Sequence, residues 1–112
     1  MRFMAEMIRI DTDVLDESGE AVPLYIYQTI SLLGEKLAIT DGGYFIEDLL
    51  DAKGQSRLTE SDIKQIKRLL KGTPMTLDTR NQVLRLKCSV KQADANIAIA
   101  TKVLERLQME TK

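Results

Sequence analysis

The alternation of apolar and polar residues constrains the first third of the chain more than any other feature. It runs through residues 8–14, 22–33 and 36–40, and a period of two is typical of half-buried β-strands. A polar turn at 16–20 separates the first two segments, and the Gly-Glu pair at 34–35 fits a two-residue hairpin turn with glycine first. Three strands with such short connections predict an antiparallel meander.

A helical period replaces this alternation after Asp41, whose side chain can accept hydrogen bonds from the free amides of a following helix. Apolar residues at helical spacing predict a short helix over 44–50, ended by a glycine, and a second helix over 59–70. Thr59 is the expected N-cap of the second helix, because two acids follow it in the first turn. A last helix is predicted over 91–109.

Two further strands are predicted at 75–78 and 83–90, between the second helix and the last. The order is therefore β-β-β-α-α-β-β-α in a single domain spanning residues 1–112. This order is typical of an α+β fold with a mostly antiparallel sheet and helices packed on one face. The sheet and the last helix must bury their apolar sides against each other. The residues expected in that main core are Leu84, Leu86, Ile97, Ala100 and Leu104.

The composition removes most catalytic chemistry. Histidine is absent, and with it the commonest general base and metal ligand. The single cysteine, Cys88, excludes an internal disulfide framework and is interpreted as a small hydrophobic residue of a strand. No apolar run approaches the roughly eighteen residues of a membrane span, and the first residues lack the pattern of a secretion signal. We therefore expect no enzyme activity, no catalytic residues, no cofactor and no membrane contact.

Two acidic segments match metal-binding sequences in part. Asp11-x-Asp13-x-x-Asp16-Glu17 has the opening spacing of a calcium loop, but the positions for its third ligand, its glycine and its last glutamate hold other residues. The three carboxylates within 47–51 could bind magnesium, but their spacing fits the solvent side of a helix. No metal site is therefore predicted.

Charge is divided between the two halves of the chain. Residues 1–51 hold eleven carboxylates against three Lys and Arg, whereas residues 52–112 hold thirteen Lys and Arg against six carboxylates. Such asymmetry favours partners of opposite charge, or pairing of the chain with itself as a homodimer. The acidic residues predicted to bind a partner are Asp11, Asp13, Asp16, Glu17, Glu20, Glu47, Asp48 and Asp51.

A basic ridge is predicted on the second helix, where four cations occupy positions i, i+3, i+4 and i+7. These are Lys64, Lys67, Arg68 and Lys71, and the further cations grouped with them are Lys53, Arg57, Arg85 and Lys87. Such a group is able to contact nucleic-acid phosphates. A solvated helix face explains the same spacing, and aromatic residues for base stacking are few.

The segment at 37–50, Leu-Ala-Ile-Thr-Asp-Gly-Gly-Tyr-Phe-Ile-Glu-Asp-Leu-Leu, resembles the marker of a known family. That family is domain of unknown function eighteen twenty-eight, in which a strand ending Leu-Thr-Asp-x-Gly precedes an aromatic residue or Thr, an Ile and Asp-Leu. The surrounding order of strands and helices is similar too, although the Pro-Phe-rich first strand of the family is missing here. The family occurs in bacteria, often in phage and prophage genomes. The resemblance therefore implies a phage or prophage setting and no particular activity.

Together, the charge division and the resemblance predict a non-enzymatic protein-interaction module of phage or prophage origin in the cytoplasm of a bacterial host. Its acidic surface is expected to bind another protein, basic or nucleic-acid-binding, and to inhibit a target such as a defence nuclease. The alternative is a nucleic-acid-binding regulator that uses the basic second helix.

Overall fold

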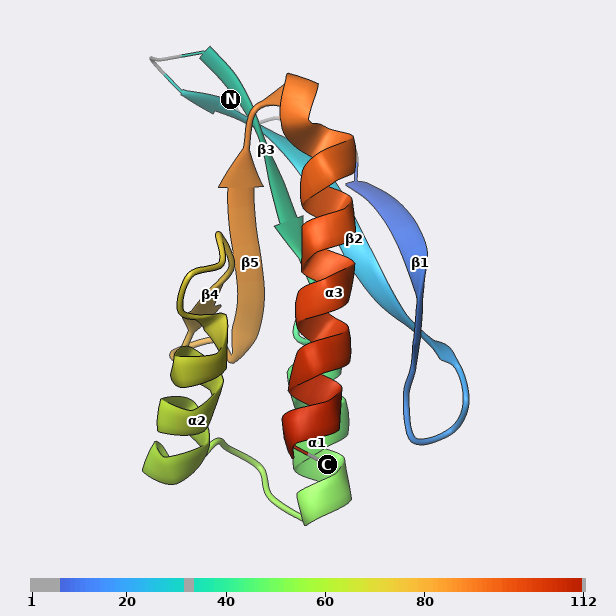
Figure 1. Ribbon diagram of the computed structural model, residues 1–112, viewed down its shortest axis with the longest axis vertical. Coiled ribbons are helices and arrows are strands. Elements are labelled where there is room, and N and C mark those ends of the chain that lie inside the picture. Colours follow the sequence, from blue (N-terminus) through green and yellow to red (C-terminus); the bar gives the residue numbers. More distant parts are fainter. Residues whose placement is uncertain (1–6, 32–33, 112) are drawn as a thin grey trace, which may run out of the picture.

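Strands and helices follow one another in the predicted order in the computed structural model, which describes residues 7–31 and 34–111 (Figure 1). The α+β prediction is therefore confirmed. The elements are β1 (Met7–Leu15), β2 (Ala21–Ser31), β3 (Gly34–Thr40), α1 (Tyr44–Lys53), α2 (Glu60–Leu70), β4 (Thr76–Asp78), β5 (Val83–Cys88), the short 3₁₀ helix η1 (Val90–Gln92) and α3 (Ala93–Thr111).

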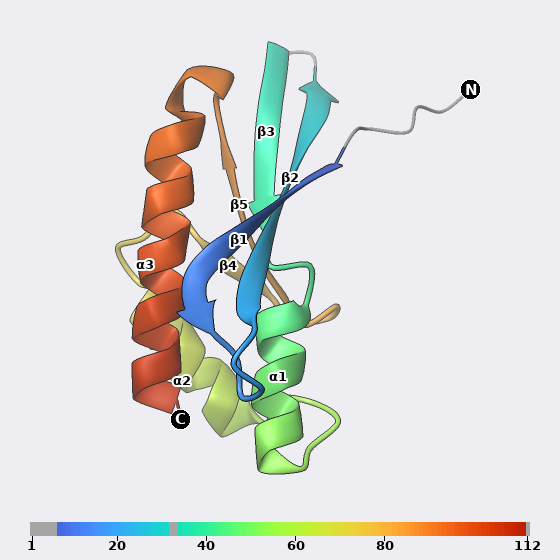
Figure 2. The same ribbon diagram turned by 90° about the vertical axis from the view of Figure 1, so that its right-hand side faces the viewer.

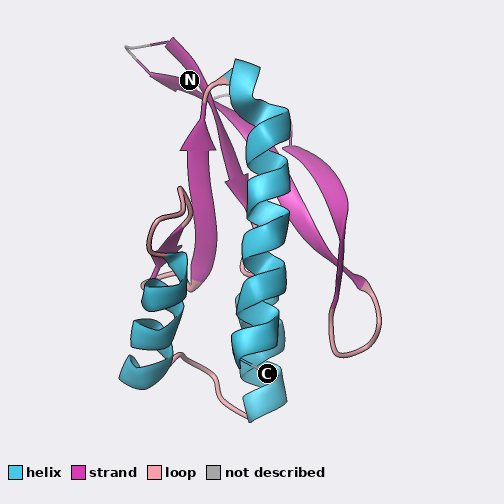
Figure 3. Cartoon of the chain, viewed as in Figure 1, coloured by secondary structure: helices cyan, strands magenta, loops and turns pink. Residues whose placement is uncertain are grey.

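The strands form one antiparallel sheet in the order β1-β2-β3-β5-β4 (Figure 3). The first three strands pair in sequence order as the predicted meander, and β5 then pairs with β3 and places β4 at the edge. The register aligns Ile26 with Ile39 and Ile39 with Leu86, so apolar side chains from three strands lie side by side on one face.

Helix α3 lies along that apolar face, as the two perpendicular views show (Figure 2). Leu84, Leu86, Ala100 and Leu104 are buried in the core that forms between them, and Ile97 packs against it partly buried. These core predictions are confirmed. Helix α1 lies below the sheet in Figure 2. Above it, within the described ranges, no helix covers the sheet face opposite α3.

The structure corrects two local predictions. The Gly-Glu pair at 34–35 is not a turn, because Gly34 pairs with Ser31 and the next residue continues β3. The connection lies at 32–33, at the end of the strand predicted over 22–33, and these two residues are outside the described ranges. Val90 does not extend β5 into the core either, since it begins η1 and is 51% exposed.

Asp41 has the capping role that the sequence predicts, and a second role besides. Its carboxylate accepts hydrogen bonds from the backbone N–H groups of Gly43 and Phe45, each at 3.0 Å, which begins α1. It also accepts from the N–H of Leu84 at 2.8 Å and so ties the start of the helix to β5. Asp41 is fully buried, and this burial raises the pKa of its carboxyl while the N–H donors oppose the shift.

The start of α2 confirms the predicted cap and adds an ion pair. The Thr59 hydroxyl accepts from the N–H of Asp62 at 3.1 Å, and the Asp62 carboxylate accepts from the N–H of Thr59 at 3.0 Å, which is a capping box. The same carboxylate pairs with Lys53 at 2.8 Å and accepts from the Gln55 amide at 3.1 Å. One buried carboxylate thus joins the end of α1 to the start of α2.

We expect Asp62→Asn to weaken the fold mainly at neutral pH. The Lys53 ammonium, followed by the Thr59 N–H, lowers the pKa of Asp62 below its ordinary value. A depressed folded-state pKa contributes stability above the unfolded pKa of about 4, and that contribution is lost as the pH falls towards the folded value. The variant should therefore lose about 1–2 kcal/mol near pH 7 and converge with the native protein in acid.

Urea titrations from pH 7 down to pH 3 would measure this difference. Asp51→Asn is the matched control, because it removes an exposed carboxylate of α1 that has no hydrogen-bond or ion-pair partner among the described residues. A constant gap between native and Asp62→Asn across the pH range would contradict the role of the ion pair.

Candidate functional site

The turn between β1 and β2 is held by Asp16. Its Oδ1 atom accepts hydrogen bonds from the N–H and hydroxyl of Ser18, at 2.9 and 2.7 Å, and from the N–H of Glu20 at 2.9 Å. Its Oδ2 atom accepts from the Tyr44 hydroxyl at 2.5 Å, and only 9% of the residue is exposed. This carboxylate is therefore engaged inside the protein and shapes the turn, and its contact with a partner stays a prediction.

Tyr44 is the link between the acidic turn and α1, of which it is the first residue. Its hydrogen bond to Asp16, together with burial, raises the pKa of the Tyr44 hydroxyl to about 12. The charges of Glu20 and Asp48 act in the same direction, so both carboxylates lie near the tyrosine although they come from different elements. Two acidic segments that are separate in the sequence therefore meet here, and Figure 2 shows the turn lying against α1.

We call this surface the acidic end and define it as Glu17, Glu20, Glu47, Asp48 and Asp51. Glu47 and Asp51 are exposed and one helical turn apart on α1, and they line a shallow hollow beside Gln55 and Gln82. Glu20, Glu47 and Asp51 have no ion-pair or hydrogen-bond partner for their side chains among the described residues.

The two remaining predicted acids lie on β1. Asp11 is exposed but pairs with Arg9 at 2.9 Å, and Asp13 is exposed at the irregular part of the pairing between β1 and β2. They extend the acidic surface along the strand, with Asp11 neutralised by its neighbour.

Cations near the acidic end are already paired. Lys53, at the last position of α1, pairs with Asp62, and Arg9 pairs with Asp11. In the described part of the chain, no three Asp, Glu, Cys or His side chains converge in a way that could hold a metal ion. The arrangement is therefore a field of negative charge spread over a surface, which suits contact with a complementary macromolecular surface.

The basic ridge lies on the side of the molecule away from the β1–β2 turn. Lys64, Lys67 and Arg68 are exposed on α2 and Lys71 is exposed directly after it, and their side chains have no hydrogen-bond or ion-pair partner among the described residues. In Figure 1 this helix is at the left, whereas the acidic turn is at the right. The division of charge along the sequence thus becomes a division in space.

Three of the four cations grouped with the ridge are engaged elsewhere. In addition to the Lys53 pair, Arg57 donates to the backbone oxygens of Thr79 and Arg80 at 3.5 and 3.4 Å, and Arg85 pairs with Asp78 at 3.1 Å. The sequence could not show these partners, because only the fold decides which carboxylates and carbonyl groups lie within reach of each cation.

The sheet face opposite α3 was not predicted as a surface of interest. Tyr25 and Tyr27 are half-buried on it, and the register places Tyr25 between Arg9 and Thr40. Lys87 is exposed on the same face. The alternation within β2 predicts that both tyrosines lie on one face. The nearby cations, Arg9 and Lys87, come from β1 and β5, and the sequence does not reveal the order of these strands in the sheet.

A scan against protein-family models found no match to this chain, and searches of curated proteins and of solved structures found none either. The family resemblance of residues 37–50 therefore stays a prediction. Within residues 7–31 and 34–111, no helix is long and apolar enough to cross a membrane.

Proposed function

We propose that this protein is a non-enzymatic binding module that docks its acidic end onto a basic surface of another protein. The observation that carries the proposal is the meeting of two acidic segments across the Tyr44–Asp16 hydrogen bond. Gathering like charges destabilises the folded chain by repulsion. A fold that keeps them together, while the nearest cations are paired elsewhere, favours an external partner that supplies the opposite charge.

Nucleic-acid-binding proteins are the class of target that fits best. Their binding surfaces already present Lys and Arg in an array that accepts closely spaced negative charges. Exposed carboxylates on a firm support, here one helix and one hydrogen-bonded turn, can occupy such an array and block it. A phage or prophage origin would make a host defence nuclease a natural target, and inhibition the natural result.

The proposal is tested by comparing which host proteins bind to three immobilised forms of the protein. The native form and the ridge variant Lys64→Gln/Lys67→Gln/Lys71→Gln should capture the same basic target. The acidic-end variant Glu47→Gln/Asp48→Asn/Asp51→Asn should lose it, because exposed charges supply most of the attraction. Added duplex DNA should release the target from the native form, since both compete for one surface.

Each variant changes three exposed or half-exposed side chains on one helix, so circular dichroism should show native folding in both. Equal capture by the native and acidic-end forms would sink the proposal. Capture that resists DNA but depends on the acidic end would keep the binding role and remove nucleic-acid-binding proteins as the target class.

A nucleic-acid-binding regulator is the second candidate, and the unpaired cations of the ridge favour it. They span residues 64–71 of α2, a length of about 10 Å that reaches only a few phosphates. A titration with labelled duplex DNA at two salt concentrations would test it. For each phosphate contact, the binding constant should fall by about one logarithmic unit when the salt concentration rises tenfold. Such binding, if the ridge variant abolishes it, would favour this candidate over the first.

A further inference from the structure

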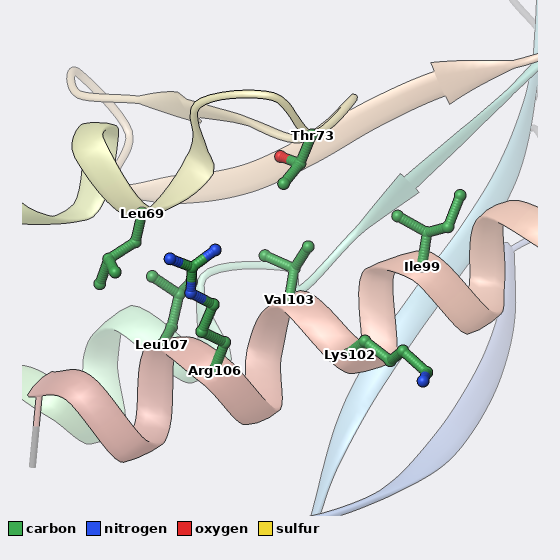
Figure 4. Close-up of a pocket in the computed structure, with 7 residues that line it drawn as sticks. All are labelled: Leu69, Thr73, Ile99, Lys102, Val103, Arg106 and Leu107. Carbon is green, nitrogen blue, oxygen red and sulfur yellow. The ribbon is translucent and has the colours of Figure 1, made fainter.

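A groove of about 250 Å³ runs between α2 and α3, on the side of α3 away from β1 (Figure 4). Its floor is apolar: Leu69 comes from α2, and Val103 and Leu107 come from α3. Ile99 stands at one end and is 38% exposed. The helical spacing in the sequence predicts that Leu69 and Leu107 lie on the buried sides of two helices, but it does not show that the helices leave a gap between them.

Two cations line the same groove. Lys102 and Arg106 are exposed on α3, and within the described ranges their side chains have no ion-pair or hydrogen-bond partner. Figure 4 shows the Arg106 guanidinium lying across the groove between Leu69 and Val103. An unpaired guanidinium beside an apolar floor is suited to a ligand that carries a carboxylate next to an apolar group.

A separate hollow lies on α2. Arg68 and Lys64 of the ridge line it with Gln65, whose side-chain amide donates to the backbone oxygen of Glu110 at 2.9 Å. That hydrogen bond fastens α2 to the end of α3 and supports a fixed spacing of the two helices. The groove is therefore preformed, with an apolar floor and its positive charge on the α3 side.

The shape of the apolar surface favours an elongated occupant. Ile99, Val103 and Leu107 follow one another at intervals of about one helical turn, so the apolar lining extends about 12 Å along α3. The groove itself is smaller than the usual site for a drug-sized ligand, about 300–1,000 Å³, but it accommodates apolar side chains. Both walls are helices, whose backbone groups are largely hydrogen-bonded within the helix. The partner must therefore be recognised through side chains, as in complexes where an amphipathic helix lies in an apolar groove.

We propose that this groove is a docking site for an acidic amphipathic helix of a partner polypeptide. Its apolar side chains lie on Leu69, Val103 and Leu107, and its carboxylates pair with Lys102 and Arg106. This site is separate from the acidic end and takes a partner of the opposite charge. One molecule would therefore be able to hold two proteins, one at each side.

The test uses a fluorescein-labelled helical peptide of about 15 residues, with leucine at i, i+4 and i+7 and glutamate at the flanking positions. A second peptide has lysine at each glutamate position. Fluorescence anisotropy against the full chain at low salt should show saturable binding of the glutamate peptide. The lysine peptide should bind at least about tenfold more weakly, because it meets like charge at the rim.

Two variants locate the binding. Ile99→Glu and Arg106→Glu replace exposed residues, so both variants should fold. Each should lower the affinity for the glutamate peptide by about tenfold or more. Lys87→Glu makes the same charge change on the outer face of the sheet and should leave peptide binding within about twofold of native. These three results together would support the docking site.

Three outcomes would overturn it. One is no saturable binding of the glutamate peptide. Another is equal binding of both peptides, or binding that Ile99→Glu and Arg106→Glu leave unchanged. The last is salt-sensitive self-association that Ile99→Glu abolishes while the peptide does not bind, which would make a second copy of this chain the occupant. The first two outcomes do not depend on the acidic end, so the proposed function is tested separately.

Discussion

Leu104→Ala should lower the free energy of unfolding by about 2–5 kcal/mol. Leu104 is fully buried between the sheet and α3, where the side chains of Leu84 and Leu86 also lie. Truncation removes apolar area from the core and leaves a cavity, because surrounding side chains relax only in part. A loss of this size is a large share of the stability of a domain of this length, about 5–15 kcal/mol.

The denaturation midpoint in urea is the direct measurement. Met109→Ala on the same helix is the matched control, since Met109 is 80% exposed and its truncation should change stability by less than about 0.5 kcal/mol. If both variants unfold at the native midpoint, α3 is not docked on the sheet as described.

Asp41→Ala should cost about 3–5 kcal/mol, because three buried backbone N–H groups lose their acceptor at once. Those of Gly43 and Phe45 belong to the start of α1, and that of Leu84 belongs to β5. Asp41 is fully buried, so bulk water does not contact these groups in the native fold, and leaving them without an acceptor is costly. Asp41→Asn should cost less, because its carbonyl oxygen still accepts and it carries no charge that burial disfavours.

Thermal unfolding and amide exchange would test the prediction at two levels. Stability should fall, and the N–H groups of Phe45 and Leu84 should lose protection together, since one carboxylate serves both. Asp51→Ala, on the exposed side of α1, should leave both measurements near native. An Asp41→Ala protein with native stability would show that the link between α1 and β5 contributes little.

The two proposed sites share one physical basis, which is that the fold separates charge. The acidic end lies at the β1–β2 turn and α1, whereas α2 with its cations lies on the opposite side of α3 from that turn (Figure 1), and the groove cations lie between α2 and α3. Attraction between two copies is therefore expected at low salt as well, and it should weaken as exposed charges are screened over about 8 Å at physiological salt. Light scattering across a salt series would detect such a homodimer or chain of copies.

The sequence alone determined the features that depend on near neighbours. Alternation in β1, β2 and β5 and the helical spacing in α3 identify the buried sides, because a side chain's face follows from the period of its own element. The cap at Thr59 and the acceptor role of Asp41 are also local, since an N-cap bonds amides within a few residues. The order of strands and helices follows from these signals.

The tertiary structure alone decided which distant residues meet. The connection between β2 and β3 falls before residue 34, because the pairing of Ser31 with Gly34 belongs to the register of the two strands and not to the turn sequence. The bond of Asp16 to Tyr44 and the insertion of β5 beside β3 join segments far apart in the chain. Such contacts depend on how whole faces pack, and no local pattern encodes that packing. For this reason the sequence showed that charge was divided, whereas only the fold showed the acidic end and the groove.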